Sequence, residues 1–200
     1  MGRQWIASQG RAVGAALILT HLIGGVTFGQ GAGVPFRHDN HPDNLKALFQ
    51  AIHRARTAND TRSAAELVRS VLPDEARIRA GLRNGVPDDV VARFVALHKS
   101  WPSDTDAAAA DLFTMRPDQT EVHVSGATTE ELQAYAHGSM AFNEFPGGTQ
   151  GLAHTVLRPG MRYYEVALVA PGKPRGMKFH FFFWDGSRWT MLGPVWRALR

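Results

Sequence analysis

The chain has 200 residues, of which 44% are hydrophobic and 20% are charged, and its formal net charge is +4. This length and composition fit one globular domain with its own hydrophobic core, and they exclude a disordered chain, a collagen-like repeat and a polytopic membrane protein. Because the sequence contains no cysteine, disulfides, thiolate nucleophiles and metal sites with cysteine ligands are excluded as well.

Residues 1–29 differ in composition from the rest of the chain. Arg3 and Arg11 precede an uncharged, mostly apolar stretch over residues 12–29. A basic start followed by a short apolar stretch is typical of a secretory signal peptide, here cut before Gln30. An uncleaved membrane anchor is the alternative, although a membrane-spanning helix requires ~20 predominantly apolar residues and this stretch contains several glycines. With either a signal peptide or an anchor, the rest of the chain is exported to the periplasm or another extracytoplasmic compartment. The third alternative is a cytoplasmic protein.

The stretch 30–42 is predicted to be a linker, because glycine and proline punctuate it without an apolar period. A single domain over residues 43–200 follows, and its first part is helical. Apolar residues at helical spacing predict helices at 44–57, with Asp43 as the N-cap, and at 61–72. Pro73-Asp74 and Val86-Pro87-Asp88 then introduce a third and a fourth short helix.

The period changes after residue 120. The expected elements are a short strand at 122–124, helices at 129–135 and 147–157, and strands at 163–169, 177–184 and 188–192. Asp185-Gly186 joins the last two strands in a hairpin. Helices followed by antiparallel strands predict an α+β fold, in which the N-terminal helices pack on one face of a mainly antiparallel sheet.

Two segments carry a family resemblance. Their motifs are Leu45-x-x-Leu48-Phe49-x-Ala51, Asn59-Asp60, Ala64-Ala65-x-Leu67 and the hairpin Phe183-Trp184-Asp185-Gly186-Ser187-Arg188-Trp189. These motifs resemble the opening and closing parts of the nuclear-transport-factor-like superfamily, which includes ketosteroid isomerases and polyketide cyclases. The resemblance implies a curved sheet folded against helices around an apolar pocket. No residue here matches the isomerase's aspartate base or oxyanion tyrosine, so the resemblance implies no catalytic residue.

The strand at 177–184 carries the candidate site. Strict alternation places its residues on two faces, one with Lys178, His180, Phe182 and Trp184 and the other with Phe179, Phe181 and Phe183. Such a strand is either buried on both sides for packing alone, or it lines an aromatic pocket in which His180 is the polar group. On the neighbouring strand Tyr163 and Glu165 share a face, so Glu165 meets His180 if the register allows. A His–Glu pair either transfers protons or is a satisfied buried pair.

The C-terminal segment 191–200 is apolar and aromatic to its end. Trp196 and Leu199 either close the core or belong to a docking surface with Arg197, because Trp and Arg are enriched at binding hot spots. The candidate residues for ligand or partner binding are Tyr163, Phe182, Trp184, Trp189, Trp196 and Arg197.

The remaining patterns argue against other chemistry. The histidines lack metal-ligand spacing, so no metal site and no cofactor is expected. No run of five or six Lys or Arg occurs, so nucleic acid is not an expected partner. The leading hypothesis is an exported, non-catalytic binding or accessory domain for a protein partner or a small apolar ligand, in one version a subunit held to a membrane complex through residues 12–29. The rival hypothesis is a pocket enzyme of the isomerase or cyclase type, with His180 and Glu165 as its acid–base pair.

Overall fold

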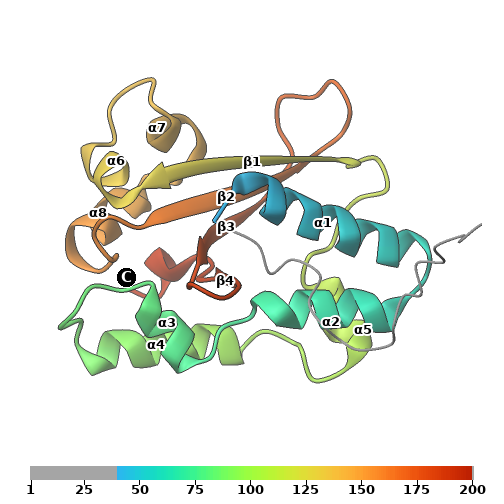
Figure 1. Ribbon diagram of the computed structural model, residues 1–200, viewed down its shortest axis with the longest axis horizontal. Coiled ribbons are helices and arrows are strands. Elements are labelled where there is room, and N and C mark those ends of the chain that lie inside the picture. Colours follow the sequence, from blue (N-terminus) through green and yellow to red (C-terminus); the bar gives the residue numbers. More distant parts are fainter. Residues whose placement is uncertain (1–39, 200) are drawn as a thin grey trace, which may run out of the picture. The chain divides into compact units, whose positions relative to one another are not determined.

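The computed structural model describes residues 40–199. The predicted signal peptide or anchor and most of the predicted linker lie outside the described residues. Over the described part the fold is α+β, as predicted, with helices and one four-stranded antiparallel sheet (Figure 1). Within residues 40–199, no helix has the length and apolar character needed to cross a membrane.

The four predicted N-terminal helices are confirmed as α1 (Pro42–Thr57), α2 (Thr61–Val71), α3 (Glu75–Ala80) and α4 (Asp88–Lys99). Their boundaries have local causes, since Asp60 and Asp74 accept hydrogen bonds from the first-turn N–H groups of α2 and α3. The first helix begins inside the predicted linker, with Pro42 in its first turn and His41 rather than Asp43 as its N-cap. The helix therefore begins two residues earlier than predicted, with a proline at a first-turn position that tolerates it.

A fifth helix, α5 (Asp106–Asp111), was not among the predicted elements. Its run of alanines shows no apolar periodicity, because identical small residues at successive positions do not distinguish a buried helix face from an exposed one. In the structure Ala109 and Ala110 pack against Ala64 and Ala65 of α2. The small side chains allow the two helices to approach closely, and this tertiary contact stabilises the helical conformation of α5.

The sheet has the order β1-β2-β3-β4, and each strand is antiparallel to its neighbour. Its strands are β1 (Glu121–Thr128), β2 (Arg162–Val169), β3 (Met177–Trp184) and β4 (Trp189–Met191). Three short helices connect β1 to β2, namely α6 (Thr129–Ala134), α7 (Met140–Glu144) and α8 (Gly148–Thr155), and a 3₁₀ turn, η1 (Val195–Arg197), follows β4. The five-residue α7 was not predicted, because it is too short to show a period.

Two hydrophobic cores lie on opposite faces of the sheet. The first core joins α1 and α2 to the sheet, and its members include Leu45, Phe49, Val68, Val166 and Phe182. The second core joins α3, α4, α6, α7 and α8 to the sheet, and its members include Phe94, Leu152, Tyr163, Phe181 and Phe183. The prediction that the N-terminal helices share one face is therefore correct for α1 and α2 but wrong for α3 and α4. Both faces of the central strands are apolar, so both need a helical cover.

A β-bulge in β3 overturns the predicted alternation of its side chains. Tyr164 pairs with Phe182 while Val166 pairs with Phe179, so two residues of β3 lie opposite the single residue Glu165. The inserted residue shifts the period by one. Accordingly Phe182 packs with Phe179 in the first core, whereas Phe181 and Phe183 belong to the second core.

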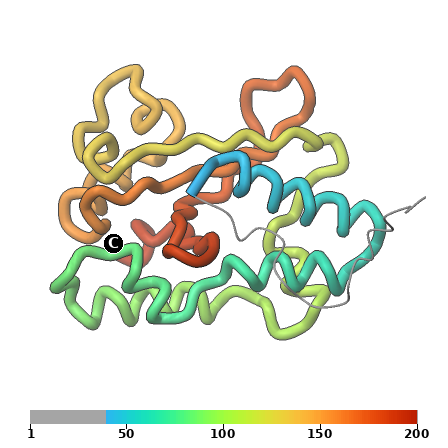
Figure 2. Tube along the Cα trace, in the orientation of Figure 1, coloured from blue at the N-terminus to red at the C-terminus, as the bar shows by residue number. Residues whose placement is uncertain are grey.

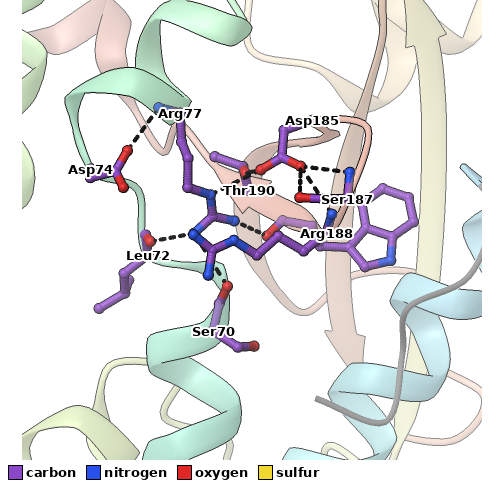
Figure 3. Close-up of polar contacts among 9 residues, drawn as sticks. Ser70, Leu72, Asp74, Arg77, Asp185, Ser187, Arg188 and Thr190 are labelled. Carbon is purple, nitrogen blue, oxygen red and sulfur yellow. Dashed lines mark hydrogen bonds and ion pairs between the residues drawn. The ribbon is translucent and has the colours of Figure 1, made fainter. Parts of the chain in front are cut away.

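A buried ion pair fastens α3 to the β3–β4 hairpin (Figure 3). The side chains of Arg77 and Asp185 are 8% and 7% exposed, and Arg77 Nε lies 3.0 Å from Asp185 Oδ2. The remaining donors of Arg77 reach the carbonyl oxygens of Ser70, Leu72 and Trp189. One guanidinium therefore links the end of α2, the start of α3 and strand β4.

Both carboxylate oxygens of Asp185 also accept more than one hydrogen bond. Its Oδ1 accepts hydrogen bonds from the backbone N–H and hydroxyl of Ser187 and from the backbone N–H of Arg188. Its Oδ2 accepts from the hydroxyl of Thr190 in addition to Arg77. The Asp185 side chain thereby closes the hairpin turn and joins that turn to α3. Segments 189–197 and 75–99 lie side by side as a result, as the tube in Figure 2 shows in red and green.

Candidate functional site

The bulge brings the predicted pair together. His180 is one of the two β3 residues opposite Glu165 of β2. Its Nδ1 is hydrogen-bonded to Glu165 Oε2, and Glu165 Oε1 accepts the backbone N–H of Phe181 at 3.4 Å. Phe181 has the positive φ of 58°. The same carboxylate therefore orients the imidazole and holds the bulge that presents it.

The two partners differ in their contact with solvent. The side chain of Glu165 is 1% exposed and that of His180 is 22% exposed. Burial raises the pKa of Glu165, although the hydrogen bond with His180 opposes this shift. Within the part of the chain that the structure describes, His180 Nε2 has no hydrogen-bond partner. The pair thus places one bound and one free nitrogen of the same ring at the edge of the second core.

Three elements pack around the edge of β3 that carries this histidine. Trp196 of η1 meets its ring edge to face, with the ring centroids 5.1 Å apart. Trp196 in turn lies against Gly148 of α8, where an added Cβ would be 3.2 Å from the indole. Lys178 Nζ pairs with Glu144 Oε2 at 2.7 Å and donates to the carbonyl oxygen of the same residue at 2.9 Å. These contacts hold α7, α8 and η1 around the edge of β3.

The predicted binding residues do not converge on one pocket. Tyr163 is fully buried in the second core, where burial raises its pKa and its hydroxyl donates to the carbonyl oxygen of Gly81. Phe182 and Trp189 are buried in the first core, and Trp184 packs against Trp189 with the ring centroids 5.5 Å apart. Trp184 and Trp196 remain half-buried, and only Arg197 is exposed. The candidate residues are thus divided between the two faces of the sheet.

One feature was missed by the sequence patterns. A cleft of about 490 Å³ lies between α3, α4 and the segment after α4, and Trp101 and His98 line it. His98 Nδ1 is 2.7 Å from the carbonyl oxygen of Phe94, and its Nε2 is 3.1 Å from that of Met191. Burial lowers the pKa of His98, although these hydrogen bonds oppose the shift. Because Trp101 follows the end of α4, helical periodicity alone does not show that it faces a cleft.

Metal ligation is not indicated in the described residues. Over residues 40–199, no group of three or more histidine, aspartate or glutamate side chains is arranged to hold a metal ion. Among these residues His123 pairs with Glu121, which lies two positions earlier in β1, at 3.3 Å.

The comparisons with known proteins add no assignment. No family model matches this chain, and no curated protein or solved structure is significantly similar to it. Its function is therefore inferred from the residues themselves.

Proposed function

We propose that this chain is a non-catalytic binding or accessory domain that acts outside the cytoplasm. The observation that supports the proposal is the filling of its interior. Tyr163 and Phe182 are fully buried, and their rings contact other aromatic side chains of the two cores. A ligand therefore has no access to these rings without displacing the core. Binding in this proposal takes place at the surface, through the accessible parts of Trp196 and Arg197.

The His180–Glu165 pair has a structural role in this proposal. It satisfies a buried carboxylate and holds the bulge residue Phe181 through its backbone N–H. A buried polar group left without a partner costs about 1–3 kcal/mol, so the pair contributes to the stability of the fold.

Substitution separates binding from structure. Arg197→Ala is expected to weaken recovery of a stoichiometric partner by about tenfold, as loss of a hot-spot arginine does, while His180→Gln is expected to cost stability and leave recovery intact. The measurement is quantitative co-purification of the full-length chain with its cross-linked partner, and the matched control is Arg54→Ala, an exposed arginine of α1. A partner lost with His180→Gln and kept with Arg197→Ala would contradict the proposal.

The compartment has its own test. We propose export, with residues 1–29 removed as a signal peptide or with residues 12–29 kept as an anchor to a membrane complex. Intact mass spectrometry of protein from the membrane and soluble fractions is expected to give either a chain that starts near Gln30 or the full-length chain in the membrane fraction. Full-length protein found only in the soluble cytoplasmic fraction would overturn this part of the proposal.

A second candidate function is a pocket enzyme with an acid–base pair, in keeping with the resemblance to isomerases and cyclases. The observation that favours it is the orientation of His180, whose Nδ1 is held by Glu165 while Nε2 has no partner among residues 40–199 and the side chain is 22% exposed. A histidine held in this way is suited to proton transfer. This role requires His180→Gln to abolish turnover in a domain that remains folded, which activity assays and unfolding curves distinguish from a structural role.

A further inference from the structure

The cleft beside α4 has the composition of a binding site. Apolar side chains from the α2–α3 connection, α3 and α4 line it together with one tryptophan, and these are Leu72, Pro73, Ile78, Val95 and Trp101. Its volume of about 490 Å³ is within the range of about 300–1,000 Å³ that ligand sites occupy. None of the candidate residues of the His180 site lines it, so this cleft is a separate feature of the surface.

The tryptophan wall is fixed in position. Trp101 lies 4.6 Å from His98, centroid to centroid, and the two ring nitrogens of that imidazole lie 2.7 Å and 3.1 Å from the carbonyl oxygens of Phe94 and Met191. The indole also lies against Gly193, where an added Cβ would be 2.7 Å from Cη2 of Trp101. A side chain held by two contacts loses little conformational entropy when a ligand binds to it.

The loop that carries the far edge of the cleft is also anchored. Arg69 of α2 donates two hydrogen bonds to the carbonyl oxygen of Ser103 and pairs with Asp106 at 2.6 Å. The anchored loop positions Asp104, which lines the cleft.

The rim of the cleft is acidic. Asp74, Glu75 and Asp104 contribute three carboxylates, against the single ammonium group of Lys99. Glu75 is paired with Arg79 at 2.8 Å. Asp74 and Asp104 are exposed, and neither forms an ion pair with a described residue. An apolar floor, a tryptophan and the exposed carboxylates of Asp74 and Asp104 complement a ligand that is cationic at one end and apolar at the other.

We propose that this cleft binds a basic peptide segment, with an arginine or lysine side chain over Trp101 and an adjacent apolar side chain on the floor. The cation is stabilised by the face of the indole ring and by the carboxylates of Asp74 and Asp104. An aliphatic neighbour in the peptide removes the apolar floor from water. Peptide recognition here uses different residues from the proposed contacts at Trp196 and Arg197, so either proposal can fail without the other.

The test uses the full-length chain and two labelled peptides, acetyl-Leu-Arg-Leu-Arg-Leu-amide and its counterpart with glutamate in place of arginine. Fluorescence anisotropy is expected to show binding of the basic peptide only, weakening as the salt concentration rises. Trp101→Leu is expected to weaken binding about 30-fold, the effect of losing a hot-spot tryptophan. Asp104→Asn is expected to weaken it about 3-fold, in the range of an exposed charge contact.

Asp89→Asn is the matched control, because it removes the same charge from an exposed position on α4 outside the cleft. This variant is expected to bind the basic peptide as the wild type does. Asp104 is exposed, so its variant tests the proposal even if Trp101→Leu fails to fold. Equal binding of both peptides, or an Asp104→Asn effect no larger than that of Asp89→Asn, would overturn the proposal.

Discussion

Replacing Asp185 with asparagine is expected to lower the free energy of unfolding by about 3–5 kcal/mol, because it leaves a buried guanidinium without its counter-charge. Arg77 is 8% exposed and has no other carboxylate within ion-pair distance among the described residues. The substitution also weakens the hairpin turn, since the amide cannot accept every hydrogen bond that the carboxylate accepts from Ser187, Arg188 and Thr190. Urea unfolding followed by circular dichroism measures the loss.

The control for this experiment is Asp118→Asn. Asp118 pairs with Arg116 at 2.7 Å, but both side chains are at least half exposed, so the expected loss is less than about 1 kcal/mol. Replacing both members of the buried pair by apolar residues is expected to cost less than Asp185→Asn alone, because no unpaired charge then remains. An Asp185→Asn variant as stable as the Asp118→Asn control would contradict the interpretation.

The same pair gives a defined dependence on pH. Burial alone would raise the pKa of Asp185, but hydrogen bonds from Ser187, Arg188 and Arg77 outweigh it and hold the pKa below the ordinary 3.8. A carboxyl whose pKa is lowered by folding stabilises the native state above pH 3.8, and this contribution is lost as the pH falls below that value. The difference in stability between wild type and Asp185→Asn is therefore expected to shrink as the pH is lowered from 4 toward 2.

Glu165→Ala is the second substitution with a large expected effect, a loss of about 3 kcal/mol in the free energy of unfolding. It creates a cavity at a position with 1% exposure. It also removes the acceptor for the backbone N–H of Phe181 and the partner of His180. Thermal and urea unfolding measure the total, and the His180 imidazole resonances report whether the bulge persists.

Glu165→Gln is the matched control, because it keeps the volume and removes the titrating group. Burial raises the pKa of Glu165 above its ordinary 4.5, so its favourable contribution is complete below that value and is lost as the pH rises through the shifted pKa. Wild type is therefore expected to lose stability relative to Glu165→Gln as the pH rises from 4.5. A difference between the two proteins that is independent of pH would show that Glu165 does not titrate in this way.

The sequence by itself determined the elements whose causes are local. Asp60 and Asp74 cap their helices from the adjacent residue, and the apolar period of residues 45–52 gives α1 its buried face, so neighbours in the chain carry this information. The positions of β2, β3 and the hairpin at Asp185-Gly186 follow from alternation and turn residues in the same way. The His180–Glu165 pair was a conditional prediction, since it depended on the register between two strands.

Only the tertiary structure decided how these elements face one another. The β3 bulge at Phe181 places Phe182 on the face opposite to the predicted one, because one inserted residue inverts the alternation of side chains. The bulge is defined by pairing with the neighbouring strand, so the sequence of β3 alone does not reveal it. The Arg77–Asp185 pair and the Trp101 cleft join residues from distant segments, so no spacing in the chain encodes them. Capping and periodicity act between neighbours, whereas strand register, ion pairing and cleft formation depend on which distant segments the folded chain brings together.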